Sequence, residues 1–528
     1  MSKTRAAYIA TICIVFVLFL STALSWDYDL GFRLRTGELI LSNLRTLDFQ
    51  SFKPSNLSDP YSYTMPSFPY VEHSWGTGVV WALLYRWSGM YGIAFFQIIL
   101  FALTIAVTRA RVTKATANYH LPNLQRQFLQ TYRLTNLQTF IFHPATILAV
   151  AAILPFYGIR AHVAGWLLFA LLFWIIFDRI RWKTRRWILP VFFFLWANMH
   201  GSFLAGLLIL ILAMGIRTIE KRKIDLSDTG ITVLSTTATL LNPYGKEIWR
   251  EVMMTMLDAQ LSSSINEWQP AYTHADLAFP AYLIMALVFI SKYRNRFTSE
   301  EKVISGFSLT AAFWSSRNIP IFTIVSLPLL IRSITYFSKD IAGIRSAPER
   351  FRRAWRTVQI GTIFILAIAI GINISHVIRF HRGSVYPQKA VEFMQRNEQN
   401  GNVFAPMHWG GYLIFYYPEK KVFVDGRMVS WRWREHPPQE LGSAFDDYVN
   451  IVSGRVDYNP YFSQYRIETV IWNNPERPDT YRFIERTFPL LEFSFGMPMY
   501  GKGFIEQLEK DGWIRIYENE TTVIYKKV

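Results

Sequence analysis

The sequence of 528 residues contains one cysteine, Cys13, which lies inside the first hydrophobic run. No disulfide within the chain and no cysteine-based metal centre can therefore form. A Walker-type phosphate loop, a Rossmann dinucleotide fingerprint and an HExxH zinc motif are also absent, which argues against ATP hydrolysis and zinc proteolysis. The sequence shows no internal repeat and no low-complexity tract, so it gives no sign of a repeat architecture.

Apolar and aromatic residues are abundant. Hydrophobic residues make up 51% of the chain and aromatic residues 16%, and the mean hydropathy is positive, above ordinary globular usage. Apolar runs recur to about residue 378, whereas residues 379–528 have a mixed polar pattern punctuated by Pro and Gly. We therefore expect a polytopic α-helical membrane domain over 1–378 and a soluble extracytoplasmic α/β domain over 379–528.

The net charge of +17 comes from Lys and Arg that collect between the hydrophobic runs. This spacing is the positive-inside pattern of a multi-pass membrane protein, and it argues against nucleic acid as a partner. The clusters fall within residues 109–133, 179–186, 221–223, 292–296 and 345–356.

About eleven runs are long and apolar enough to cross a lipid bilayer, for which roughly 20 residues are needed, fewer when neighbours cover the ends. The expected helices are 7–25, 90–108, 138–156, 162–178, 187–199, 203–217, 229–242, 277–291, 303–316, 319–337 and 357–378. The basic amino terminus resembles a secretory signal without a cleavage site, so we interpret 7–25 as a signal anchor. We expect a protein of the cytoplasmic (inner) membrane, with its amino terminus inside and its carboxy-terminal domain outside.

The first outer loop, 27–77, begins with Asp27 and Asp29, two carboxylates at a helix exit. Leaving either near hydrocarbon without a partner costs several kcal/mol. One could act as a general base or a metal ligand with the other as its support, or both could cap the following helix. The turn that starts at Asp59 predicts ordered structure, and 30–44 and 75–87 could be helices at the membrane surface.

Other polar residues gather at the outer ends of the expected helices. Arg160, His162, His200 and Arg317 could bind phosphate, or could be snorkelling anchors and caps. The pair Glu72 and His73 could act as acid and base, hold a metal or anchor the loop. Asn198, Glu267 and Trp268 could contact a sugar, although helix capping and an interfacial tryptophan explain them equally well.

Three motifs of the first outer loop carry a resemblance to known proteins: Asp27-Tyr28-Asp29-Leu30-Gly31-Phe32-Arg33, Asp59-Pro60-Tyr61-Ser62-Tyr63-Thr64 and Glu72-His73-Ser74-Trp75. Together they resemble bacterial membrane proteins of the GT-C glycosyltransferase superfamily, which includes protein O-mannosyltransferases, aminoarabinose transferases and oligosaccharyltransferase catalytic subunits. The resemblance implies that the first outer loop supplies the catalytic carboxylate. Asp29, four residues before Arg33, fits the register better than Asp27, and the bacterial relatives usually carry His in place of Arg33.

A second segment, His408-Trp409-Gly410-Gly411-Tyr412 followed by Asp425-Gly426-Arg427, resembles the acceptor-recognition segment of oligosaccharyltransferases. Gly410 replaces the Asp of that signature, so recognition of a peptide sequon is not supported. The simpler interpretation is a strand and a turn in the α/β domain.

The resemblance therefore implies transfer of a sugar from a polyprenyl-phosphate donor to a lipid, glycan or protein acceptor of the cell envelope. Asp29 would be the catalytic base with Asp27 beside it, and a divalent cation, Mg²⁺ or Mn²⁺, could bind Asp29 and Asp59. The donor phosphate would contact Arg160, His162, His200 and Arg317, and the acceptor or sugar would contact Glu72, His73, Asn198, Glu267 and Trp268. A transporter or flippase for lipid-linked sugars and a non-catalytic assembly protein remain alternatives. The former is disfavoured because the sequence shows no charges in the helix interiors, no paired broken helices and no repeated halves.

Overall fold

The computed structural model describes residues 3–45, 58–117, 143–258, 261, 265–273, 277–342, 353–354, 357–358, 360–371, 386–397, 400–475 and 502–527. The chain forms two compact units. The first comprises Met1–Ala23, Tyr91–Leu241 and Glu267–Val377, and the second comprises Leu24–Met90, Asn242–Asn266 and Ile378–Val528. The second unit thus combines the tail with the first outer loop and one later loop, both of which the sequence analysis assigns to 1–378.

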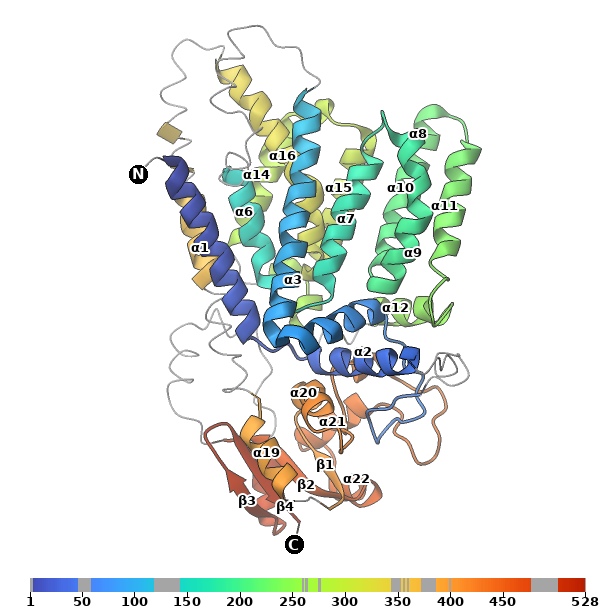
Figure 1. Cartoon of the computed structure of the whole chain (residues 1–528), viewed down its shortest axis with the longest axis vertical. Coiled ribbons are helices and arrows are strands. Elements are labelled where there is room, and N and C mark those ends of the chain that lie inside the picture. Colours follow the sequence, from blue (N-terminus) through green and yellow to red (C-terminus); the bar gives the residue numbers. More distant parts are fainter. Residues whose placement is uncertain are drawn as a thin grey trace. The chain divides into compact units, whose positions relative to one another are not determined.

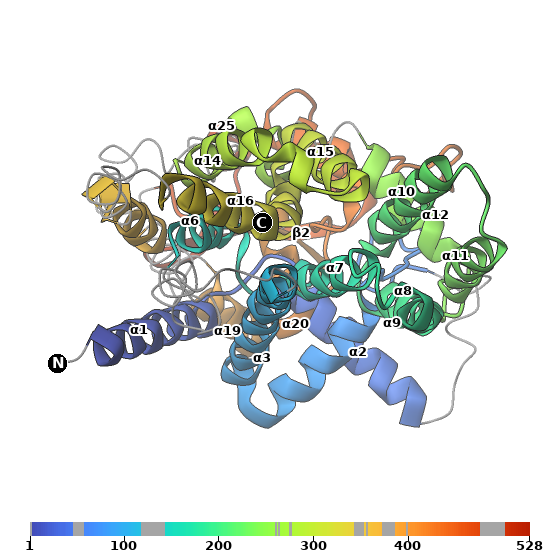
Figure 2. The same cartoon turned by 90° about the horizontal axis from the view of Figure 1, so that it is seen from above.

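The first unit is built from apolar helices, which can satisfy every backbone polar group internally. Figure 1 and Figure 2 both draw α14, α15 and α16 side by side, and α9 packs against α11. The helices among the described residues include α1 (Lys3–Leu24), α3 (Trp75–Ala117, shared with the second unit), α6 (Pro144–Ile153), α7 (His162–Ile176), α8 (Trp182–Arg185), α9 (Leu189–Met199), α10 (Phe203–Lys221), α11 (Leu226–Ala238), α14 (Ala278–Lys292), α15 (Ser299–Trp314), α16 (Ile319–Ala342) and the apolar helix Ile360–Gly371.

Most of the expected spans correspond to a helix with ends within a few residues of the prediction. Residues 138–142 and 372–378 of two expected spans lie outside the described residues. Among the residues that the structure describes, three helices are long and apolar enough to cross a membrane: Trp75–Val112, Phe203–Lys221 and Ser316–Ser338. Several shorter apolar helices accompany them. The count of eleven spans stays a prediction.

The long helix α3 joins two segments that the sequence analysis separates, 75–87 and 90–108. Its backbone is non-helical at Ser88 and Gly89, where Gly89 has a φ of 59°. This is a left-handed conformation that favours glycine. The two expected segments therefore meet at a kink, and the boundary between the compact units falls directly after it, between Met90 and Tyr91.

Helix α15 starts four residues before the predicted span because its amino terminus is capped. The Thr298 side chain accepts from the Glu301 backbone N–H at 3.2 Å, and Glu301 Oε2 accepts from the Thr298 N–H at 3.1 Å. The neighbouring Glu300 is fully buried and accepts from Arg217 and, at 2.7 Å, from Arg179. This carboxylate thus joins α15 to α10 and to the turn after α7.

The second unit contains a four-stranded mixed sheet in the order β1-β2-β4-β3. The pair β1–β2 is parallel, and the other two pairs are antiparallel. Phe404 of β1 stacks on Trp472 of β2 with ring centroids 5.9 Å apart, in the aromatic core of this domain. The elements of the unit are α2 (Leu30–Arg45), α12 (Glu247–Leu257), α19 (Gln388–Arg396), β1 (Asn402–Phe404), α20 (Gly410–Tyr416), α21 (Ala444–Val452), α22 (Asn459–Gln464), β2 (Ile467–Asn473), α25 (Lys502–Lys510), β3 (Ile514–Glu518) and β4 (Thr522–Lys526).

The segment that begins at His408 is helical, so the predicted strand is wrong there, whereas the predicted turn is present at Gly426-Arg427. Helix α20 packs against α2 through two glycines. A Cβ at Gly31 would lie 1.8 Å from the Gly411 carbonyl oxygen, and a Cβ at Gly411 would lie 2.1 Å from the Tyr28 carbonyl oxygen. Tertiary packing at this close approach, rather than local propensity, determines the conformation of the segment.

Hydrogen bonds to backbone groups join the first outer loop to the tail domain. The Tyr63 N–H donates to the Val422 carbonyl at 3.1 Å, and the Val422 N–H donates to the Tyr61 carbonyl at 2.9 Å. The Thr64 hydroxyl donates to the Phe423 carbonyl at 2.6 Å. The ordered turn predicted from Asp59 onward is confirmed, and these bonds explain why the loop and the tail form one unit.

Candidate active site

Asp27 and Asp29 lie at the amino terminus of α2. Asp27 Oδ1 accepts from the Asp29 backbone N–H at 3.1 Å, and the Asp27 carbonyl accepts from the Leu30 N–H at 3.1 Å. The Asp29 side chain is 44% exposed. A helix amino terminus stabilises negative charge, so this position keeps a carboxylate both ionisable and accessible.

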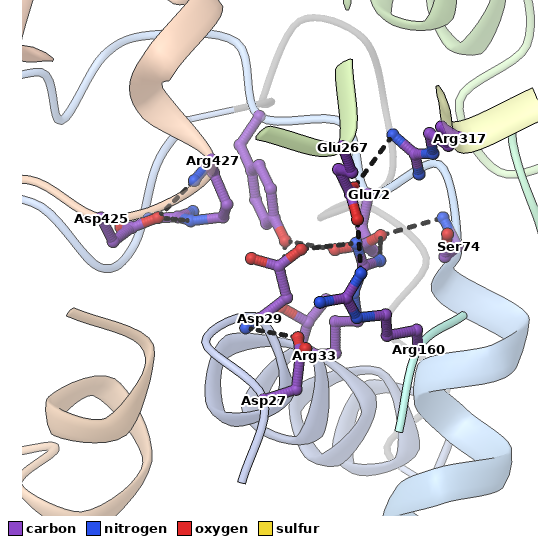
Figure 3. Close-up of polar contacts among 12 residues, drawn as sticks. Asp27, Asp29, Arg33, Glu72, Ser74, Arg160, Glu267, Arg317, Asp425 and Arg427 are labelled. Atoms are coloured by element: carbon purple, nitrogen blue, oxygen red, sulfur yellow. Dashed lines mark hydrogen bonds and ion pairs between the residues drawn. The ribbon is translucent and has the colours of Figure 1, made fainter. Parts of the chain in front are cut away.

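Arg33, one turn into α2, lies between two carboxylates (Figure 3). Its Nη1 donates to Glu72 Oε1 at 2.7 Å, and its Nη2 lies 3.5 Å from Asp29 Oδ2. Burial lowers the pKa of Arg33, but the charges of Glu72 and Asp29 outweigh that effect and raise it. Arg33 is therefore a permanent cation beside Asp29.

Glu72 is almost completely buried and uses both oxygens within the protein. Besides Arg33, Oε1 accepts from the Ser74 backbone N–H at 2.9 Å, and Oε2 accepts from the Tyr70 hydroxyl at 2.9 Å. Burial raises the pKa of Glu72, but the charges of Arg33 and the adjacent His73 lower it below its ordinary value. These contacts favour a role in holding Arg33 over the acceptor or sugar contact expected from the sequence. His73 itself is half-buried.

Asp59, a predicted metal ligand, has both carboxylate oxygens hydrogen-bonded within the protein. Its Oδ1 accepts from Arg427 Nη1 at 2.6 Å and from the Tyr61 N–H at 3.2 Å, and its Oδ2 accepts from the Ser62 N–H at 2.8 Å. Its side chain is fully buried. Within the described part of the chain, no group of three or more His, Cys, Asp or Glu residues is arranged to hold a metal ion. This donor set does not fit a divalent cation shared by Asp29 and Asp59.

The first compact unit contains an outer arginine cluster, which we define as Arg160, Glu267, Trp268 and Arg317; Figure 3 labels Arg160, Glu267 and Arg317. Glu267 Oε2 accepts from Arg160 Nη1, and Glu267 Oε1 lies 3.7 Å from Arg317 Nη1. The Arg317 guanidinium lies 4.8 Å from the centre of the Trp268 ring. Burial raises the pKa of Glu267, but the charges of Arg160 and Arg317 lower it to about 2. Two arginines against one carboxylate leave a net positive charge.

Hydrogen bonds to backbone carbonyls fix the shape of this cluster. The hydroxyls of Ser315 and Ser316 donate to the Glu267 carbonyl at 3.2 and 3.1 Å, and the Ser316 N–H donates to the Gln269 carbonyl at 2.8 Å. The Gln97 amide donates to the Arg160 carbonyl at 3.1 Å. The chain segments around Arg160, Glu267 and Arg317 are therefore each held by hydrogen bonds within the protein.

The remaining predicted residues make contacts that account for them structurally. His162 Nε2 donates to the Phe156 carbonyl at 2.9 Å, and His200 Nδ1 accepts from the Ser202 N–H at 3.1 Å. The Asn198 amide donates to the carbonyls of Phe194 and Leu241 at 2.7 and 3.1 Å. These bonds close helix ends and turns, in keeping with the capping alternative for these positions.

The structure thus brings Asp27, Asp29 and Glu72 together in one unit, and Arg160, Glu267, Trp268 and Arg317 together in the other. A cavity common to both groups stays a prediction. Tyr70, which contacts Glu72, and Arg427, which contacts Asp59, were not predicted as neighbours of this group of carboxylates. For Arg427 a signal was present, because Asp425-Gly426-Arg427 ends an apolar run.

No protein-family model matches the sequence, and comparison with curated proteins finds no match. The structure is similar to the archaeal oligosaccharyltransferase AglB from Archaeoglobus fulgidus in complex with an inhibitory peptide and a dolichol-phosphate. The TM-score is 0.56 at 12% identity, over 100% of this chain and 74% of that chain. For the apo oligosaccharyltransferase of the same organism the TM-score is 0.50 at 12% identity, over 98% and 74% of the chains. For ArnT from Cupriavidus metallidurans in the apo state it is 0.47 at 12% identity, over 100% and 99%.

The chain therefore shares the overall fold of these two archaeal oligosaccharyltransferase structures. The apolar helices agree with a multi-pass membrane protein.

Proposed function

We propose that this protein is a membrane glycosyltransferase that transfers a sugar from a polyprenyl-phosphate donor to an acceptor at the outer face of the cytoplasmic membrane. The observation that carries the proposal is the half-exposed Asp29 carboxylate in the first loop of a GT-C fold, beside the buried cation Arg33. Similarity at 12% identity supports the fold alone. The activity is inferred from the site.

In this reaction Asp29 acts as the general base. It accepts the proton of the acceptor hydroxyl or amide while the acceptor oxygen or nitrogen attacks the anomeric carbon of the sugar. The bond between that carbon and the donor phosphate oxygen breaks, and its electron pair leaves with the lipid phosphate. Arg33 keeps Asp29 ionised before the proton moves, since a nearby cation favours the charged carboxylate.

Negative charge grows on the donor phosphate as this bond breaks. Fixed cations stabilise such charge in the transition state. Arg160 and Arg317 supply it in our proposal, because two guanidinium groups share the single carboxylate of Glu267. The dolichol-phosphate in the AglB complex makes a polyprenyl phosphate a suitable donor to test. The described donor set around Asp29 does not fit a metal ion, so the arginines carry this role in the proposal.

The test compares Asp29→Asn with Asp27→Asn in membranes that contain equal amounts of each protein. Radiolabelled polyprenyl-phosphate hexoses and pentoses are supplied one at a time, and transfer of label to membrane acceptors is measured. Loss of a general base lowers turnover by about 10²- to 10⁴-fold, so Asp29→Asn should do so and Asp27→Asn should have a smaller effect. Unchanged transfer by Asp29→Asn would overturn the assignment of Asp29. Absence of transfer by the wild type with every donor would overturn the proposed activity.

A further inference from the structure

The turn Asp425-Gly426-Arg427 of the tail domain is held by a buried ion network. Arg427 Nη2 donates to Asp425 Oδ2 at 2.6 Å, Nε donates to Asp425 Oδ1 at 2.8 Å, and Nη1 reaches Asp59. The Arg427 backbone N–H also donates to Asp425 Oδ1 at 2.9 Å. Figure 3 shows Asp425 and Arg427 joined in this way. Each of the three guanidinium nitrogens thus donates to a carboxylate oxygen within the protein.

Aromatic rings enclose the same guanidinium. Its central carbon lies 4.6 Å from the ring centre of Tyr70, 4.9 Å from Tyr61, 5.1 Å from Trp431 and 5.5 Å from Phe32. Burial lowers the pKa of Arg427, but the charges of Asp425 and Asp59 raise it well above its ordinary value. Buried ion pairs contribute little net stability compared with apolar residues of the same volume. The network therefore fixes the geometry of the turn more than it stabilises the fold.

This turn lies directly against the Asp29 carboxylate. A Cβ built at Gly426 would stand 3.0 Å from Asp29 Oδ1, tighter than ordinary van der Waals contact. Helix α20 also packs closely against the turn, because a Cβ at Gly410 would lie 2.5 Å from Asp425 Cβ.

We propose that Gly426 and Arg427 are positioning residues for Asp29, and that the tail domain thereby completes the active site formed by the first outer loop. Arg427 fixes the turn, and Gly426 leaves the space that the Asp29 carboxylate occupies. The inference rests on the proposed function, because it assigns Asp29 the proton transfer. Beyond that function, the inference states that Gly426 and Arg427 determine the position of the Asp29 carboxylate.

The kinetic test is Gly426→Ala, assayed with whichever polyprenyl-phosphate sugar supports transfer in the wild type. The added methyl group would displace Asp29 by a few tenths of an ångström. Since a misplacement of about 1 Å can cost about 10²-fold in rate, we expect kcat to fall about tenfold, with an unchanged KM for the donor and an unchanged melting temperature. The matched control is Gly503→Ala in α25, where an added Cβ meets no atom within 4 Å.

The outcomes separate the two ideas. Wild-type kcat in Gly426→Ala, together with an inactive Asp29→Asn, would overturn the positioning role and leave the proposed function intact. Full activity of Asp29→Asn would overturn the proposed function. A fall in both kcat and melting temperature in Gly426→Ala alone would indicate a merely structural role and would also overturn the inference.

A second measurement tests the juxtaposition without any activity assay. Cys13 is the single cysteine of the chain, so Cys13→Ser gives a cysteine-free background. Adding Asp29→Cys with Gly426→Cys should give a disulfide on mild oxidation, seen as a mobility shift that a reductant reverses. The pair Asp29→Cys with Gly503→Cys serves as the control and should not react. Equal crosslinking in both pairs, or in neither, would overturn the inference.

Discussion

The Arg33 guanidinium forms a buried ion pair with the Glu72 carboxylate, with Nη1 and Oε1 2.7 Å apart and side chains 10% and 3% exposed. The two residues are 39 positions apart. They join the first turn of α2 to the turn before α3. The second carboxylate near Arg33, that of Asp29, lies at 3.5 Å and is far more exposed. One cation therefore serves a structural and a candidate catalytic carboxylate at once.

Removing this cation should destabilise the fold. Arg33→Met leaves Glu72 buried without its cation, which costs about 3–5 kcal/mol, and the melting temperature of the purified protein in detergent should fall accordingly. Arg35→Met is the control, because its pair with Glu38 is partly exposed at 3.3 Å and is worth about 1 kcal/mol or less. The double variant Arg33→Met with Glu72→Met should recover much of the loss. Equal melting temperatures for the two single variants would contradict this account.

Glu300 is a second fully buried carboxylate, and it pairs with Arg179 and Arg217. Glu300→Gln should cost about 3–5 kcal/mol because the buried Arg217, together with the half-exposed Arg179, loses its charge partner. Glu220 also pairs with Arg179, but its side chain is 34% exposed, so Glu220→Gln should cost about 0–1 kcal/mol. Thermal unfolding of both variants in one detergent compares them. A Glu220 variant as unstable as the Glu300 variant would argue against burial as the cause.

Donor binding should depend on the outer arginine cluster. Arg160→Gln leaves Arg317 and Glu267 with no net charge, so the KM for the polyprenyl-phosphate donor should rise about tenfold, equivalent to about 1.4 kcal/mol. Arg294→Gln removes an exposed arginine of the first unit and should leave the donor KM unchanged. Measurement at two salt concentrations adds a check, since the difference between wild type and Arg160→Gln should shrink as salt rises. A donor KM that is equal in both variants would count against the phosphate assignment.

The pH dependence of stability should reveal Glu251 of α12. Burial, together with the charge of Glu72, raises the pKa of Glu251 from its ordinary 4.5 to about 8. Between these values the folded protein binds a proton that the unfolded chain does not, so stability is greatest at the acid end and falls as pH rises toward 8. Glu251→Gln should flatten the melting temperature over this window. If the melting temperature of Glu251→Gln falls with rising pH as much as that of the wild type, another group causes the pH dependence.

The long apolar runs predicted much of the first unit. Helices α7, α10, α14 and α16 begin within a residue or two of the expected positions, because hydrophobic length alone specifies a buried or membrane-facing helix. The start of α15 was missed, since Thr298 and Glu301 extend the helix into polar sequence through a capping box. Helix α12 was missed because it is short and amphipathic, without an apolar run.

The candidate site was predicted only in part. Asp29 and Glu72 were identified from local sequence, because each stands in a short motif of the first outer loop. Their surroundings depend on contacts with no local signature: Arg427 reaches Asp59 across 368 positions, and Gly31 meets Gly411. Such pairs are chosen by tertiary packing, so periodicity and propensity carry no information about them.

The hydrogen bond from Thr64 to Phe423 joins residues 359 positions apart, which constrains how the chain is made. The ribosome completes the first outer loop long before it synthesises the segment that supplies these backbone partners. Until then Asp59 lacks its ion-pair partner Arg427, and the Tyr63 N–H lacks its acceptor, the Val422 carbonyl. The Asp29 site can therefore mature only after the segment from Val422 to Arg427 has been synthesised.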